Sequence, residues 1–137
     1  MSNIRHIFKY TKAGDYKRPI IPISIKHKGK VIKYLALIDS GADSNIFHID
    51  IARLLEIDLR VLNKIQFAGI KKDRLCNGYI TVLELGIDDE FYDCPIMFSS
   101  DISNSGYGVL GQRGFFDHFK VSLDYKTDNI QLKQSKR

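Results

Sequence analysis

The chain of 137 residues has the length of one domain, which excludes an enzyme that builds two lobes from a single chain. Hydrophobic residues make up 44% and charged residues 27%, so an ordinary globular core is expected. The net charge of +5 is uneven, because residues 1–33 hold nine basic residues and one acidic residue, whereas residues 34–125 hold eight basic and fourteen acidic residues. We expect a basic arm over residues 1–17, one domain over residues 18–133 and a polar tail over residues 134–137.

The arm allows two interpretations. A basic segment can bind nucleic acid or an anionic membrane surface through phosphate contacts, or it can be a solvated terminus that keeps the protein soluble. Because no aromatic ladder or recognition motif accompanies the charge, the sequence favours the solvated terminus over nucleic acid. The arm also lacks an apolar signal region, and no stretch of the chain approaches the ~20 apolar residues of a membrane helix.

Two cysteines, Cys76 and Cys94, are too few and too far apart for the disulfide framework of a small secreted domain. We therefore expect free thiols and a cytoplasmic protein. The four histidines lie far apart, and no C-x-x-C pair is present, so neither a metal nor another cofactor is expected.

Short strands dominate the predicted elements. Residues 19–26 predict a strand with three isoleucines on one face. Residues 31–38 form a more continuous apolar run, as expected of a strand buried on both faces. The turn between them makes this pair a hairpin. After an extended piece at 45–47, apolar residues at helical spacing predict a short helix in IDIARLLEI, with Asp50 as its cap.

The second half of the chain continues as a β-meander, with strands at 61–68, 79–87 and 91–98. The short apolar run Val109–Leu110 leads into Gly111, a compact helical stretch at 113–119 and a final hairpin of residues 121–125 and 129–133. We expect Phe115, Phe116 and Phe119 to pack in the core. Many short strands with one or two short helices predict an all-β domain, closed or partly closed.

The sequence LIDSGAD, residues 37–43, takes an apolar strand directly into a carboxylate. An unpaired buried charge costs several kcal/mol, so Asp39 needs a partner or a function. Taken alone, D-S-G is most simply a turn, because Asp and Ser cap turns and Gly tolerates positive φ. The later Val109–Leu110–Gly111 run changes that balance, because a glycine there would let a second segment pass close to the D-S-G loop.

This combination resembles the retropepsin-like aspartic proteases, a single-domain family that includes the retroviral proteases. The resemblance covers roughly residues 19–132 and rests on ALIDSGADSNI (36–46), the short helix after it, the central hairpin, and GVLGQRGFFDHFKVSLDY (108–125). It implies a closed retropepsin-like barrel, an aspartic endopeptidase activity and a protein or peptide substrate.

The resemblance also implies roles for particular residues. Asp39 is similar to the catalytic aspartate, Ser40 to the hydroxyl residue that braces paired loops, and Gly41 to the glycine whose backbone faces substrate. The residues that it places against substrate are Ala42, Asp43, Ala68, Gly69, Ile70 and Val109. Of these, Ala68, Gly69 and Ile70 lie at the tip of the central hairpin and resemble the flap.

Two features depart from the family pattern. The flap is followed by charged residues at 71–74 rather than by more glycine. Gln112 stands where many relatives have Arg directly after the glycine of the second motif. Arg113 is the neighbouring cation, and whether it pairs with Asp43 stays open because one residue turns a helix by ~100°.

An aspartic protease needs two carboxylates about 3 Å apart that share one proton, so that one acts as base and the other as acid on a water molecule. This chain has one D-S-G, so the resemblance implies a homodimer with one Asp39 from each chain. Two alternatives stay open: a non-catalytic dimerisation or peptide-binding module on the same fold, and a small basic nucleic-acid-binding domain.

Overall fold

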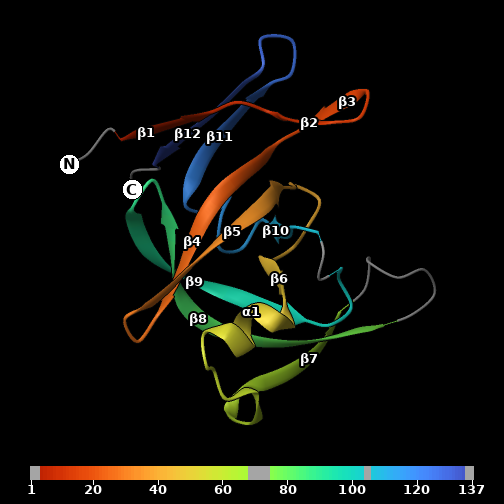
Figure 1. The fold of residues 1–137 in the computed structure, drawn as a ribbon, viewed down its shortest axis with the longest axis vertical. Coiled ribbons are helices and arrows are strands. Elements are labelled where there is room, and N and C mark those ends of the chain that lie inside the picture. The colour runs from red at the N-terminus through yellow and green to blue at the C-terminus, as the bar shows by residue number, and fades with distance from the viewer. Residues whose placement is uncertain (1–3, 68–74, 104–105, 135–137) are drawn as a thin grey trace.

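The computed structural model describes residues 4–67, 75–103 and 106–134, and these are mostly strands (Figure 1). The elements, in chain order, are β1 (Arg5–Phe8), β2 (Thr11–Ala13), β3 (Tyr16–Arg18), β4 (Ile20–His27), β5 (Lys30–Ile38), β6 (Ile46–His48), α1 (Ile49–Leu54), a 3₁₀ turn (Leu59–Val61), β7 (Asn63–Phe67), β8 (Cys76–Ile87), β9 (Glu90–Ser99), β10 (Gly108–Leu110), β11 (Phe119–Asp124) and β12 (Asn129–Gln134).

The main sheet has the strand order β4-β5-β10-β6-β9-β8-β7, and β4 also pairs with β8. That extra pairing, in which Ile25 lies opposite Leu85, closes the strands into a ring. The expected hairpin of β4 and β5 and the meander of β7, β8 and β9 are both present. The all-β expectation is therefore confirmed.

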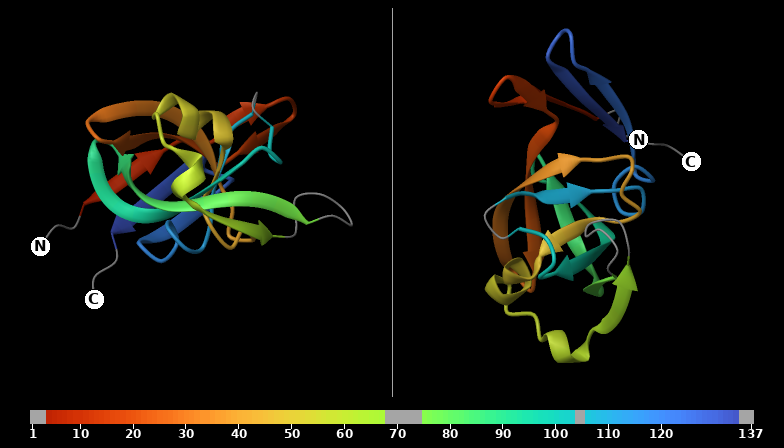
Figure 2. Two further views of the ribbon diagram at one scale, coloured as in Figure 1. Left: turned by 90° about the horizontal axis from the view of Figure 1, so that it is seen from below. Right: turned by 90° about the vertical axis from the view of Figure 1, so that its right-hand side faces the viewer.

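The position of β10 distinguishes this sheet from a simple meander. β10 lies between β5 and β6, parallel to the first and antiparallel to the second (Figure 2, right). Strands β5 and β6 are joined by residues 39–45, so this loop must pass over the end of β10. The loop contains the D-S-G motif.

A three-stranded sheet of order β1-β12-β11 lies beside the ring (Figure 1). Residues 5–8, within the stretch that the sequence assigns to an arm, pair with β12 of the same chain, and the His6 ring is buried with its Nδ1 2.8 Å from the Asp88 carboxylate. β2 and β3 form a separate hairpin. The division of the chain at residue 17 stays a prediction.

The core is one buried cluster formed by strands of the ring, by α1, by the turns that follow Gly111 and by β11 and β12. Ile21, Ile23 and Ile25 are buried on one face of β4, as expected, and Phe115 and Phe119 are buried with Phe116 packed partly against them. The expectation that residues 31–38 are buried on both faces is wrong. Val31 and Leu35 are about half exposed, because one face of β5 is open in the single chain.

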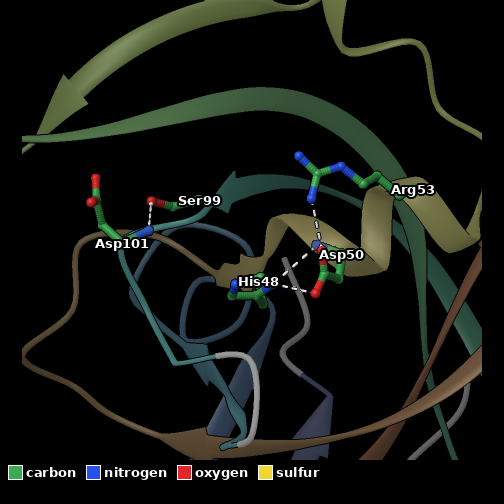
Figure 3. Close-up of polar contacts among 5 residues, drawn as sticks. All are labelled: His48, Asp50, Arg53, Ser99 and Asp101. Carbon is green, nitrogen blue, oxygen red and sulfur yellow. Dashed lines mark hydrogen bonds and ion pairs between the residues drawn. The ribbon is translucent and has the colours of Figure 1, made fainter.

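The start of α1 also differs from the prediction. His48, not Asp50, is the N-cap: its ring Nδ1 accepts a hydrogen bond from the Asp50 N–H at 3.0 Å. The Asp50 carboxylate accepts one from Arg53 one turn further along (Figure 3). Ser99, the register partner of His48 on β9, is buried, donates to the Asn77 carbonyl and accepts from the Asp101 N–H. His48 and Ser99 are therefore occupied in structural contacts.

The helical stretch expected at 113–119 is absent, since residues 114–118 form turns and Phe119 begins β11. Gly114 has φ +104°, which an α-helix cannot accommodate, and its N–H donates to the Asp117 carboxylate. Within the described ranges, no helix is long and apolar enough to cross a membrane.

Candidate active site

The loop 39–45 is fastened to the end of β10 and the residues that follow. The Asp39 N–H donates to the Leu110 carbonyl at 3.0 Å, continuing the pairing of β5 with β10 by one residue. The N–H groups of Gln112 and Arg113 donate to the carbonyls of Ala42 and Asp43 at 2.8 and 2.9 Å. The two sequence motifs, far apart in the chain, therefore meet in one structure.

Gly111 is needed where the two segments cross. A Cβ at this position would lie 2.7 Å from the Ala42 carbonyl oxygen and would also collide with the Ser44 carbonyl. Both obstacles are backbone atoms, which a rotamer change cannot remove. The expectation that a glycine lets the segments pass closely is confirmed.

Asn45 joins the loop to two further elements, a role that was not predicted from the sequence. Its side chain is fully buried; Oδ1 accepts from the Gly111 N–H at 3.0 Å, and Nδ2 donates to the Pro95 carbonyl at 3.5 Å. Its backbone carbonyl accepts from the Met97 N–H at 2.9 Å. A buried amide with both ends bonded fixes the loop against β9 and β10.

Asp39 is half-buried at the C-terminal end of β5, and its own loop binds it. The Gly41 N–H donates to Asp39 Oδ1 at 2.9 Å, and the Ala42 N–H donates to the Asp39 backbone carbonyl at 3.1 Å. The loop thus provides the partner that the sequence argument required, as a backbone N–H rather than a cation. No other hydrogen bond to this carboxylate comes from the residues that the structure describes, so its remaining acceptor positions can serve a ligand.

Beside Asp39 is a cleft of about 420 Å³. Its lining residues are Asp39, Gly41, Ala42, Asp43, Ser44, Ile46, Gln66, Phe67, Met97 and Val109. Five of the residues predicted from the sequence meet here, namely Asp39, Gly41, Ala42, Asp43 and Val109. Ser40 is exposed and does not line the cleft.

The flap residues Ala68, Gly69 and Ile70 fall outside the described residues. The stem of that hairpin is described, and Gln66 and Phe67 at the end of β7 line the cleft.

Of the apolar wall of the cleft, only Val109 was predicted from the sequence. Val109 on β10 lies opposite Ile46 on β6, which lies opposite Met97 on β9. Residues directly opposite in a sheet share a face, so these three side chains form a row across three strands. Strand alternation could place each on a face, but only the non-local strand order brings them together.

Arg113 and Asp43 meet through the backbone alone. Besides the N–H···O=C bond already described, the Arg113 carbonyl accepts from the Asn45 N–H at 3.3 Å. Both side chains are exposed, and although the structure describes both residues, no ion pair joins them. The pairing that the sequence left open is therefore a backbone bridge.

Tyr92 on β9 contacts the turns that follow Gly111. The Tyr92 hydroxyl donates to the Gly114 carbonyl at 2.6 Å, and its ring stacks on His118 with 3.8 Å between ring centroids. Burial raises the pKa of the Tyr92 hydroxyl, and burial raises the pKa of the Cys94 thiol to about 12. Both groups are neutral at physiological pH, as expected for structural supports.

No cluster of three or more His, Cys, Asp or Glu side chains suited to a metal ion is found in the part of the chain that the structure describes.

The similarity of this chain to known proteins is found by comparing structures and not by comparing sequences. No model of a protein family matches the chain, and no curated protein matches its sequence significantly. Among solved structures, the chain is similar to a retropepsin-like aspartic protease from Rickettsia conorii, with a TM-score of 0.66 and 16% identity over 98% of this chain and 95% of the other.

Two further structures are similar. The EIAV protease, complexed with the inhibitor HBY-793, has a TM-score of 0.50 and 18% identity over 74% of this chain and 88% of its own. The retroviral protease-like domain of Ddi1 from Leishmania major has a TM-score of 0.50 and 13% identity over 87% and 94%. The chain therefore has the retropepsin-like fold, as its two motifs predict.

Proposed function

We propose that the protein is an aspartic endopeptidase that acts as a homodimer, with Asp39 of each chain forming the catalytic pair. The observation that carries this proposal is the position of Asp39, which lines the cleft and whose carboxylate is held by the Gly41 N–H. The fold, shared with aspartic proteases, supports the same conclusion.

The chemistry follows from two neighbouring carboxylates. Two such groups about 3 Å apart cannot both ionise cheaply, so they hold one proton between them. The ionised group takes a proton from a water molecule, which attacks the scissile carbonyl, while the protonated group supplies a proton to the departing nitrogen. The sequence holds one D-S-G, so in this proposal the second carboxylate comes from another copy of the chain.

The cleft suits peptides with apolar side chains next to the scissile bond. Its lining includes the apolar side chains of Ile46, Phe67, Met97 and Val109, and Asp39 and Asp43 contribute polar groups. Burying one apolar side chain against such a wall contributes about 1.5–3 kcal/mol. A reducing compartment such as the cytoplasm is part of this proposal, because Cys76 and Cys94 are buried free thiols.

The test is peptide hydrolysis from acidic to neutral pH, with a peptide library and the subunit mass measured in solution. Asp39→Asn keeps the size of the side chain and removes its acid–base chemistry, and Asp89→Asn makes the same change in an exposed turn between β8 and β9. We expect a dimer in all three proteins, cleavage by wild type and Asp89→Asn, and none by Asp39→Asn.

Cleavage that survives in Asp39→Asn would refute the assignment. A dimer that cleaves no peptide would favour a non-catalytic dimerisation or peptide-binding module on the same fold. Binding to nucleic acid that weakens steeply with salt would favour the basic nucleic-acid-binding domain.

A further inference from the structure

Gln112 contacts the loop on both sides of Gly41. Its backbone N–H donates to the Ala42 carbonyl at 2.8 Å, a bond that any residue except proline could make. Its side-chain Nε2 donates to the Ser40 carbonyl at 2.9 Å, a bond that requires an amide or another donor. The side chain itself is exposed.

The Ser40 carbonyl and the Gly41 N–H belong to the same peptide group. No cis peptide bond occurs among the described residues, so these two groups point in opposite directions from one plane. The carbonyl accepts from Gln112, and the N–H on the other side donates to Asp39 Oδ1 at 2.9 Å. A continuous hydrogen-bonded chain therefore runs from the Gln112 amide through this peptide group to the carboxylate.

This peptide group would otherwise be easy to turn. Rotation of the plane changes ψ of Ser40 and φ of Gly41, and glycine tolerates a wide range of φ. Each such rotation moves the N–H away from the carboxylate. A donor fixed on the carbonyl side opposes the rotation, and it also polarises the N–H that binds the carboxylate.

We propose that Gln112 is a positioning residue for Asp39, acting through the Ser40–Gly41 peptide group; for catalysis this inference rests on the proposed function. Gln112 touches neither the cleft nor the carboxylate. Because its side chain is exposed, its loss changes the stability of the fold little. Its effect is therefore on the orientation of the carboxylate.

Two variants remove the donor in different ways. Gln112→Glu keeps the shape of the side chain and replaces the donor with an acceptor, and Gln112→Ala removes the side chain without adding charge. Arg113→Ala is the matched control, since it lowers the local charge by the same amount as Gln112→Glu and leaves the Gln112 amide in place.

The first readout is steady-state kinetics together with thermal unfolding. We expect both Gln112 variants to lose about 3- to 10-fold in kcat, the value of one hydrogen bond, with KM and the melting temperature close to wild type. Arg113→Ala keeps the wild-type kcat. Unchanged kcat in Gln112→Glu and Gln112→Ala, or an equal loss in Arg113→Ala, would overturn the positioning role.

The second readout does not depend on peptidase activity. Amide hydrogen exchange at Gly41, followed by NMR, reports directly on its bond to Asp39. We expect exchange about 3- to 10-fold faster in both Gln112 variants and unchanged in Arg113→Ala. If wild type cleaves no peptide, the proposed function fails, and the exchange rate alone decides whether Gln112 holds the Asp39 loop: equal rates in all four proteins would refute it.

Discussion

Replacement of Gly111 by alanine tests the crossing of the two motifs. The added Cβ would lie 2.7 Å from the Ala42 carbonyl oxygen and would also collide with the Ser44 carbonyl. Because both are backbone atoms, the loop 39–45 would have to move away from β10 as a unit. The segment that carries Asp39 would then lose its register with Leu110.

The size of the effect follows from two contributions. Overpacking a tight site costs about 1–3 kcal/mol, and a crossing bounded by backbone belongs in the upper part of that range. The buried bond from the Gly111 N–H to Asn45 would lengthen, which costs about 1 kcal/mol more. We expect a loss of about 3 kcal/mol, which for a chain of this length lowers the melting temperature by about 10 °C.

Thermal unfolding at one fixed protein concentration measures this loss, because association would make the melting temperature depend on concentration. Gly106→Ala is the control, since a Cβ there meets nothing nearer than 3.6 Å. Gly111→Ala should also lose peptide hydrolysis. Melting of Gly111→Ala within about 2 °C of the control would refute the claim that the crossing requires glycine.

Two further predictions concern buried groups around the loop. Asn45→Leu leaves the Gly111 N–H without its acceptor and should lower the free energy of unfolding in urea by about 2–3 kcal/mol; an unchanged urea midpoint would contradict the anchoring role of the amide. Burial raises the pKa of Cys94 to about 12, so its thiol stays protonated at pH 8, and iodoacetamide should modify it only after unfolding. Mass spectrometry after timed labelling measures this, and labelling of native Cys94 at the rate of the unfolded chain would show that the thiol is accessible.

Local sequence patterns predicted most strands and the D-S-G loop. Alternation of apolar residues located β4, β8 and β9, because each strand buries one face in the same core. The glycine of the second motif pointed to the crossing because close backbone contact is a property of that residue type alone. These features depend on a few neighbouring residues or on one side chain.

Other features depend on contacts between distant segments. The 113–119 segment has a helical apolar spacing, but Asn45 and Pro95 surround Gly114, whose positive φ ends any helix. His48 is the N-cap of α1 because β6 positions the His48 ring to accept a hydrogen bond from the Asp50 N–H. Similarly, the bond from Gln112 to Ser40 exists because β10 lies between β5 and β6, an order that no local pattern specifies.

In the proposed dimer, the active site takes one Asp39 from each of two chains. Wild type and Asp39→Asn, unfolded and refolded together in equal amounts, would form both homodimers and the mixed dimer at random. If the two carboxylates act as a pair, only the wild-type dimers are active, and the mixture keeps about a quarter of the activity of the same total amount of wild type. Retention of about half of the activity would show that each chain works alone and would contradict an active site shared between two chains.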